Sequence, residues 1–81
     1  MATVAERLSQ AATQLAAVTD TPRLDAEILM AHAAGISRAV LLSRLQETFS
    51  GAPGFEASLE RRLQYEPLAY IIGEWEFFSL D

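Results

Sequence analysis

Few side chains in this sequence could carry out acid–base or metal chemistry, and they lie far apart. The only histidine is His32, and there is no cysteine. Asp25 precedes His32 by about two helical turns, so the two side chains would share a helix face without contact. A metal site needs several converging ligands, and a catalytic histidine needs a partner within hydrogen-bond distance. We therefore expect no catalytic residue and no metal ligand.

Two pairs of carboxylates occur at an interval of two residues, and neither suits shared chemistry. On a helix Asp25 and Glu27 would point apart, and we expect both to stabilise the first turns through the helix dipole. On a strand Glu74 and Glu76 would share a solvent face. A nucleotide-binding loop needs closely spaced glycines, whereas those of this chain are scattered. They are Gly35, Gly51, Gly54 and Gly73. The sequence thus predicts no cofactor site.

The charge balance argues against nucleic acid as a direct partner. All six basic residues are arginines, against eleven acidic residues, and the net charge is -5. Such a chain repels a phosphate backbone, so we expect no direct binding of nucleic acid. Arg61 and Arg62 form a basic pair that could meet an acidic patch on a partner. Adjacent arginines on an exposed helix are more often simply solvated.

The aromatic residues gather near the end of the chain. Tyr65, Tyr70, Trp75, Phe77 and Phe78 all fall within its last seventeen residues. We expect the two phenylalanines to belong to the core of a larger protein. Tyr70 and Trp75 each carry a polar group on an apolar ring, which suits an interface.

Helices must position these residues, and the first is marked by a capping box of Thr3 and Glu6. Apolar residues then recur at alternating steps of four and three, which predicts an amphipathic helix over residues 4–18. Its apolar stripe comprises Val4, Leu8, Ala11, Leu15 and Val18.

A second helix is predicted from Pro22, which suits the first helical position, with Thr21 as its cap. It would end at Gly35, because glycine permits the left-handed closing turn. Its inward stripe would comprise Leu24, Ile28 and Ala31.

The remaining helices are shorter. Ser37 can cap a third helix that runs to about Gln46, with Arg44 near the negative end of its dipole. Its inward residues would be Leu41, Leu42 and Leu45. Residues 48–54 are rich in turn-forming residues and predict a loop. A fourth helix would bury Phe55, Leu59 and Leu63, and a fifth would run from Pro67 to about Gly73.

From Trp75 to Leu80 the residues are bulky or β-forming, which predicts the start of a strand. That strand would have no pairing partner within the chain, so the sequence looks cut at a domain boundary. The fold class expected is therefore all-α, a small bundle of four to five helices that ends in the first strand of a hairpin.

Size and composition agree with a single small domain. The chain has 81 residues, of which 51% are hydrophobic, enough for one core. Neither a membrane span nor a signal peptide is indicated. The lack of cysteine fits a reducing cytoplasm, where we expect a monomer.

Two stretches resemble the release factor glutamine methyltransferase family. The first comprises Arg23, Asp25, Ala26, Glu27, Ile28, Leu29, Met30 and His32. The second comprises Arg61, Arg62, Glu66, Pro67, Leu68, Ala69, Tyr70, Ile71 and Gly73, followed by Glu76 and Phe77 at the entry to a hairpin. In order and length the resemblance covers nearly the whole chain, as the N-terminal helical domain of that family.

The resemblance implies a two-domain enzyme. In this family a Rossmann-like domain binds S-adenosylmethionine and methylates the glutamine of the Gly-Gly-Gln motif in peptide-chain release factors. The family holds the target amide with an Asn-Pro-Pro-Tyr motif. This sequence has neither that motif nor the glycine-rich cofactor loop, so no catalytic or cofactor-binding residue is carried over. Residues 1–73 would be a substrate-recognition domain, and residues 74–81 would begin a linker hairpin to a missing catalytic domain.

The partners implied are a release factor and the protein's own C-terminal catalytic domain. The candidates for contact with the release factor are Arg23, Arg61, Arg62, Tyr70 and Trp75.

Two other classes of protein are open. An acyl carrier protein needs Asp-Ser-Leu at the start of a helix. Ser58 and Ser79 each precede a leucine, but they follow Ala57 and Phe78 and not an aspartate, which argues against this class. A free-standing helical interaction module fits the helices equally well. The sequence downstream of Asp81 would separate that module from the enzyme.

Overall fold

The structure is a computed structural model that describes residues 2–52 and 54–76, with side-chain burial given as far as Gly73. It has five helices: α1 (Val4–Leu15), α2 (Pro22–Ala34), α3 (Arg38–Leu42), α4 (Phe55–Leu63) and α5 (Leu68–Glu76). The described residues contain no sheet, only an isolated bridge between Thr3 and Thr48. The prediction of an all-α bundle of four to five helices is confirmed. None of these helices is long and apolar enough to cross a membrane.

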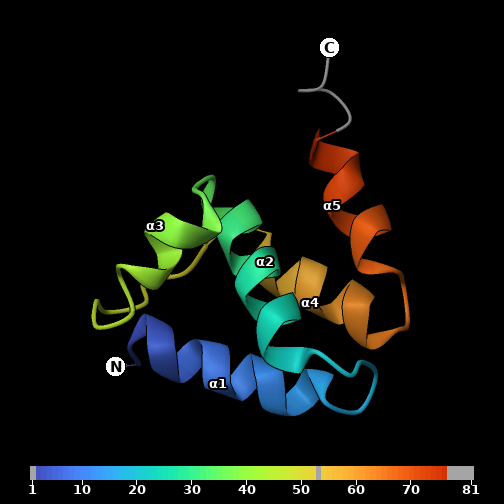
Figure 1. The fold of residues 1–81 in the computed structure, drawn as a ribbon, viewed down its shortest axis with the longest axis horizontal. Coiled ribbons are helices and arrows are strands. Elements are labelled where there is room, and N and C mark those ends of the chain that lie inside the picture. The colour runs from blue at the N-terminus through green and yellow to red at the C-terminus, as the bar shows by residue number, and fades with distance from the viewer. Residues whose placement is uncertain (1, 53, 77–81) are drawn as a thin grey trace.

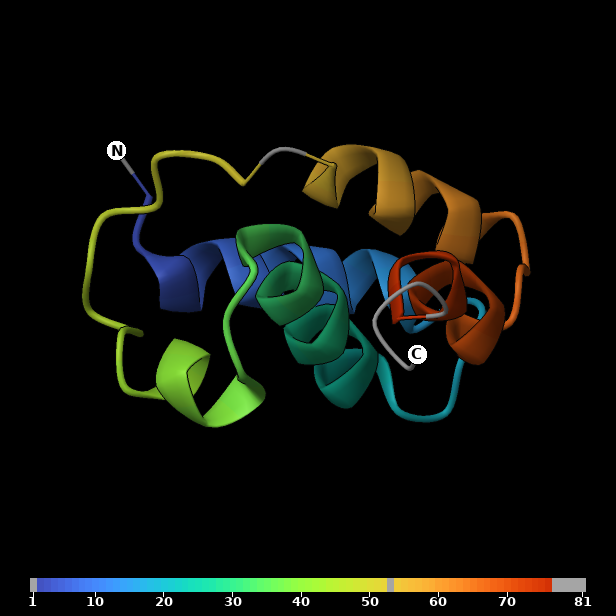
Figure 2. The same ribbon diagram turned by 90° about the horizontal axis from the view of Figure 1, so that it is seen from above.

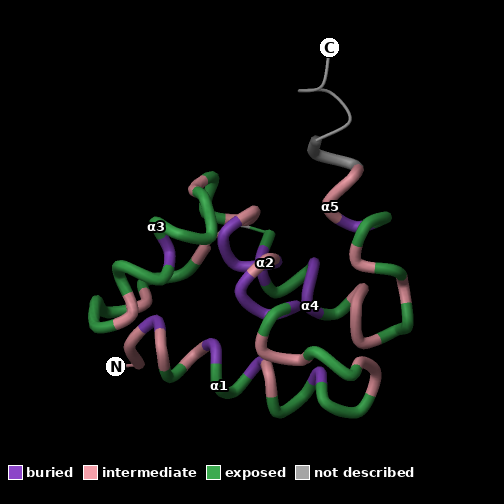
Figure 3. Tube along the Cα trace, viewed as in Figure 1, coloured by how far each residue is buried: buried purple, intermediate pink, exposed green. Residues whose placement is uncertain are grey.

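The central helix is α2, which contacts each of the other four (Figures 1 and 2). The buried positions gather along α2 and on the sides of α1 and α4 that face it (Figure 3). The core comprises Val4, Leu8, Ala11, Leu15, Ala26, Leu29, Met30, Ala31, Leu41, Phe55, Leu59 and Ile71.

The start of α1 is held in two ways. The predicted capping box is present, because Glu6 N–H donates to Thr3 Oγ1 at 3.1 Å and Thr3 N–H donates to Glu6 Oε1 at 2.8 Å. The N–H groups of Val4 and Ala5 donate to the carbonyls of Glu47 and Leu45, at 2.9 and 3.0 Å. A helix leaves its first N–H groups without internal partners, so the 45–49 segment supplies partners from far along the chain.

The end of α1 comes earlier than the predicted residue 18. After Leu15 the chain tightens, since Val18 N–H donates to Leu15 O at 2.9 Å over an interval of three residues. Val18 still packs against the core as a half-buried residue. The predicted face of this helix is confirmed, because Val4, Leu8, Ala11 and Leu15 are its buried residues.

The predicted ends of α2 are confirmed, with Pro22 in the first turn and Gly35 in the left-handed region at φ 71°. Gly35 N–H donates to His32 O and Ile36 N–H to Ala31 O, the paired bonds of a Schellman motif. Thr21 does not cap the helix with its side chain. Its hydroxyl instead donates to Asp25 Oδ1 at 3.0 Å.

The predicted inward stripe of α2 is wrong except at Ala31. Leu24 is 39% exposed and Ile28 is half-buried, whereas Ala26, Leu29 and Met30 are buried. The physical reason is that α2 has neighbours on most sides, including sides that carry Asp25 and Glu27. Leu24 and Ile28, one turn apart, are left on the remaining side.

The third helix has its predicted cap, because Val40 N–H donates to Ser37 Oγ at 3.1 Å, but it ends at Leu42 and not at Gln46. Tight turns follow, in which Arg44 N–H donates to Leu41 O and Glu47 N–H donates to Arg44 O. These turns present the carbonyls that cap α1. Among the predicted inward residues, Leu41 is buried, Leu45 is half-buried and Leu42 is exposed.

The turn between α4 and α5 passes through Tyr65, a non-glycine residue in the left-handed region at φ 69°. Tyr65 N–H donates to Arg62 O and Glu66 N–H to Arg61 O, so α4 closes with the hydrogen bonds of a Schellman motif. Within α4, Phe55 and Leu59 are buried and Leu63 is half-buried, as predicted.

The predicted strand from Trp75 is wrong for Trp75 and Glu76, which lie in α5. Gly73 was expected to end this helix, but its φ is not positive, so the helix continues through it. A helix satisfies its backbone groups locally, whereas a strand needs a partner. The rest of that predicted strand, residues 77–80, lies outside the described residues.

Candidate functional site

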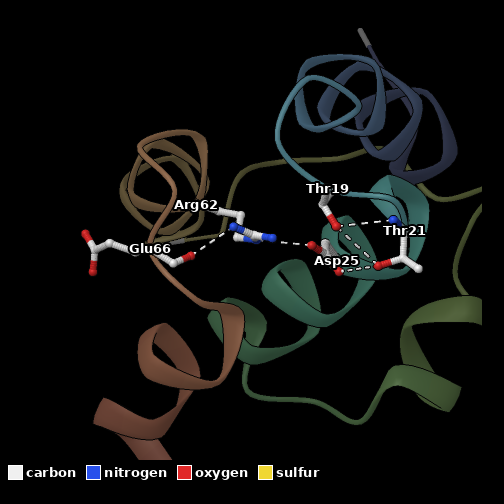
Figure 4. A network of polar contacts seen from close by, with 5 residues as sticks. All are labelled: Thr19, Thr21, Asp25, Arg62 and Glu66. Carbon is white, nitrogen blue, oxygen red and sulfur yellow. Dashed lines mark hydrogen bonds and ion pairs between the residues drawn. The ribbon is translucent and has the colours of Figure 1, made fainter.

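The two stretches that carry the family resemblance meet at a buried ion pair. Arg62 Nε on α4 lies 3.1 Å from Asp25 Oδ2 on α2 (Figure 4). Only 14% of the Arg62 side chain and 6% of the Asp25 side chain are exposed. The other oxygen of Asp25 accepts from Thr21, and Thr21 N–H in turn donates to Thr19 Oγ1 at 3.2 Å. The network thus joins the α1–α2 loop, α2 and α4.

The same arginine also holds the α4–α5 turn. Arg62 Nη1 donates to the backbone carbonyl of Glu66 at 3.0 Å (Figure 4). Arg61 binds the Glu66 carboxylate, with Nη2 at 2.9 Å and Nε at 3.1 Å from Oε1. Both members of the predicted basic pair therefore contact Glu66, one through its backbone and one through its side chain.

A second buried carboxylate is shared by two arginines. Glu27 accepts a hydrogen bond from Arg23 Nε and another from Arg38 Nε, each at 2.8 Å. Burial by itself raises the pKa of Glu27, but the hydrogen bonds and charges of Arg23 and Arg38 outweigh it and hold the pKa below its ordinary value. Arg38 lies in the first turn of α3, so Glu27 ties α3 to α2.

Sequence reasoning missed the role of Asp25 and Glu27, which it assigned to the helix dipole. One signal was present, because Arg23 and Glu27 have the (i, i+4) spacing of a helical ion pair. The Asp25–Arg62 pair had no such signal, since 37 residues separate its members.

An arginine on α1 was missed as well. Arg7 pairs with Glu56 at 2.7 Å, and its guanidinium lies 5.2 Å from the centre of the Phe55 ring. Phe55 also packs edge-on against Phe49, with ring centres 6.2 Å apart. This cluster ties α1 to the start of α4 and to the loop before it.

The five predicted contact residues differ in accessibility. The side chains of Arg62, Arg61 and Arg23 are 14%, 28% and 43% exposed, and all three form ion pairs within the chain. Tyr70 is 66% exposed on the first turns of α5. Trp75 lies in the last turn of α5, and the surroundings of its side chain are not described. The structure brings the two adjacent arginines together with Glu66 and leaves Tyr70 open.

The buried acidic groups of this site form ion pairs that join its helices. The carboxylates of Asp25 and Glu27 are matched by arginines, which neutralise them. Among the side chains described, those of residues 2–52 and 54–73, no three histidine or acidic groups lie together so that they could hold a metal ion. His32, the one histidine, is half-buried on α2.

Comparison with known proteins agrees with this architecture. Residues 6–73 match the family described as PrmC N-terminal domain, which is most of the chain. The chain belongs to the PrmC N-terminal domain family. The matched residues of this PrmC N-terminal domain cover α1 from Glu6 onward, the whole of α2, α3 and α4, and α5 as far as Gly73, and with them the Asp25, Glu27 and Glu66 networks.

Relatives extend the likeness to the whole chain. A protein of Coxiella burnetii named release factor glutamine methyltransferase is 40% identical over 83 residues, which cover 100% of this chain and 30% of that protein. A protein of the same name from Moorella thermoacetica is 39% identical over 82 residues, which cover 98% of this chain and 29% of that protein. A bifunctional methyltransferase of Rickettsia prowazekii is 47% identical over 62 residues, 74% of this chain and 12% of that protein. No solved structure matches.

The PrmC N-terminal domain described here thus spans less than a third of the length of the first two relatives. Those relatives carry further sequence that this chain lacks, and any site in that sequence is outside the present structure.

Proposed function

We propose that this chain is the substrate-docking domain of a methyltransferase that uses S-adenosylmethionine to N5-methylate the glutamine of the Gly-Gly-Gln motif in peptide-chain release factors. The observation that carries the proposal is the match of residues 6–73 to the PrmC N-terminal domain, together with two relatives of that activity's name that align with at least 98% of the chain.

The proposal gives docking to this domain and chemistry to the rest of a longer protein. The sequence contains neither a glycine-rich cofactor loop nor an Asn-Pro-Pro-Tyr motif. S-adenosylmethionine would be bound by the missing part and would supply the methyl group. An amide nitrogen is a poor nucleophile and must be held in line with the methyl donor. Binding energy from remote contacts can supply that positioning.

Five residues are proposed for contact with the release factor: Arg23, Arg61, Arg62, Tyr70 and Trp75. Their accessibility supports an order among them. Arg23 has the most exposed side chain of the three arginines, although it also pairs with Glu27. Arg62 is the most deeply buried and would act mainly by holding α5 in place. Tyr70 and Trp75 belong to α5, the last described helix, where the rest of the longer protein is a second possible neighbour. Location in the cytoplasm and a monomeric state stay predictions.

The test compares two substrates of the full-length enzyme. Removal of residues 1–73 should impair methylation of an intact release factor at least tenfold more than methylation of a short Gly-Gly-Gln peptide, because a docking contact worth about 1.4 kcal/mol gives a tenfold effect. A control is the Arg44→Ala enzyme, because Arg44 is exposed on the α3–α4 connection and is not among the proposed contact residues. Equal losses on protein and peptide would show that the helices only stabilise the enzyme, and the docking role would be abandoned.

A further inference from the structure

The helix α5 is rich in apolar residues and buries few of them. Between Leu68 and Gly73, only Ile71 is fully buried, while Leu68 and Ile72 are half-buried against the core. Within the described chain α5 contacts only α2 and α4. Figure 1 shows it extending away from the other helices toward the C-terminal end of the chain. One side of α5 is therefore without a neighbour among the described helices.

That side is formed by Ala69, Tyr70 and Gly73, which we call the outer face of α5. Gly73 lies four positions after Ala69 and three after Tyr70, spacings that place it beside both on the helix surface, on the side away from Ile71. Ala69 and Tyr70 are exposed, the tyrosine to 66%. Ala69 and Gly73 are small residues one turn apart, and the Tyr70 side chain lies beside them on this face.

Gly73 is the second observation that points to a neighbour. Glycine weakens a helix interior relative to alanine, so its presence there calls for a reason. Its φ is not positive, and a Cβ added to it would meet no atom within 4 Å. Neither a turn nor a close neighbour among the described residues accounts for it. A close approach by a segment outside the structure would account for it, since glycine lets another backbone come near.

We infer that the outer face of α5 packs against the part of the longer protein that follows Asp81. The inference rests on one element of the proposed function, that this chain is joined to a further domain, and it assigns Tyr70 to that domain in place of the release factor. The first two relatives are more than three times as long as the matched segment, and α5 is the last helix before that continuation. A covalently joined domain is present at high effective concentration beside α5, which favours it over a separate molecule. Tyrosine is also common in the centre of such interfaces.

The experiment uses the absence of cysteine from this chain. Ala69→Cys places one thiol on the outer face, and Ala57→Cys places one on an exposed position of α4 as the matched control. Each variant is made in the 81-residue chain and in the complete protein that the gene encodes. The rate of alkylation at each position is then followed by peptide mass spectrometry. We expect position 69 to react about tenfold or more slowly in the complete protein, and position 57 to react equally in both.

A bulky variant tests the fit of the face. Gly73→Leu should restore fast alkylation at position 69 of the complete protein, because leucine would prevent close packing. The same variant of the 81-residue chain should keep its helical circular dichroism, since a Cβ at this position has no described atom within 4 Å and leucine is a better helix former than glycine.

Three outcomes would overturn the inference: equal rates at position 69 in both proteins, protection that appears only when a release factor is added, or a gene that ends at Asp81. Alkylation does not depend on methyl transfer. A complete protein that protects position 69 but methylates no release factor would refute the proposed function and keep the inference.

Discussion

Arg62 and Asp25 are 37 residues apart in the sequence, and Arg62 Nε donates a 3.1 Å hydrogen bond to Asp25 Oδ2 inside the bundle. An intact buried ion pair adds little net stability, because both charges give up water to form it. Removal of one member is costly, since the other charge is left buried and unpaired. Other positions of α4 on α2 would leave one of these two charges buried and unpaired. The pair therefore favours the observed position mainly by making the other positions unfavourable.

Arg62→Ala should lower the free energy of unfolding by about 3–5 kcal/mol, because it leaves the Asp25 carboxylate without its partner. Urea denaturation measures this loss. Arg44→Ala, an exposed arginine outside the network, should change stability by no more than about 0.5 kcal/mol. The double variant Asp25→Leu/Arg62→Met should recover most of the loss. If Arg62→Ala and Arg44→Ala lower the free energy of unfolding by the same amount, the buried pair does not form in solution.

Leu29→Ala should cost about 2–5 kcal/mol, because Leu29 is fully buried on α2 and leaves a cavity when truncated. Ile28→Ala, its half-buried neighbour, should cost about 1 kcal/mol, because little of its surface packs on the core. Chemical denaturation of both variants gives the comparison. A larger loss at Ile28 than at Leu29 would mean that α2 is rotated from the orientation described.

The stability of the chain should fall as the pH drops below about 4.5, in part through Glu27. The pKa of Glu27 is lower in the folded chain than its ordinary value of 4.5, so the unfolded chain binds the proton more tightly. Its contribution is present above that ordinary value and is lost as the pH falls through the folded pKa. Glu27→Gln should flatten the dependence below about pH 4.5, in urea titrations at stepped pH. Glu60→Gln, at an exposed position, serves as control, and an equal flattening there would contradict the assignment to Glu27.

Tyr65→Gly should stabilise the chain by about 0.5–1 kcal/mol, because Tyr65 has a positive φ of 69° that glycine adopts without strain. The comparison is Gln64→Gly, one residue earlier, where φ is -91° and glycine should destabilise. Thermal unfolding followed by circular dichroism measures both. A loss of stability in Tyr65→Gly would show that the tyrosine ring contributes more than its backbone strain costs.

Local signals in the sequence predicted most of the fold. The capping box at Thr3, Pro22 at the start of α2, Gly35 at its end and Ser37 before α3 act within a few residues, and each lies where it was expected. The two amphipathic helices α1 and α4 also bury most of the predicted residues.

The errors occur where distant parts of the chain decide the outcome. The orientation of α2 depends on charged residues that are buried only because Arg62 and Arg38 reach them from other helices. Hydrophobic periodicity counts Asp25 and Glu27 as surface residues and therefore rotates the helix. For α5, a strand was expected from β-forming residues, but the described part of the chain offers no strand to pair with.

The carbonyls of Leu45 and Glu47 that accept from the first turn of α1 have a consequence for how this domain can vary. Both partners in each bond are main-chain groups, so almost any side chain is compatible with them at positions 45 and 47. The spacing from α3 is a different matter, since one added or lost residue between Leu42 and Leu45 would shift both carbonyls out of reach. These two hydrogen bonds thus constrain the length of the segment more than its side chains, although Leu45 itself also packs against the core.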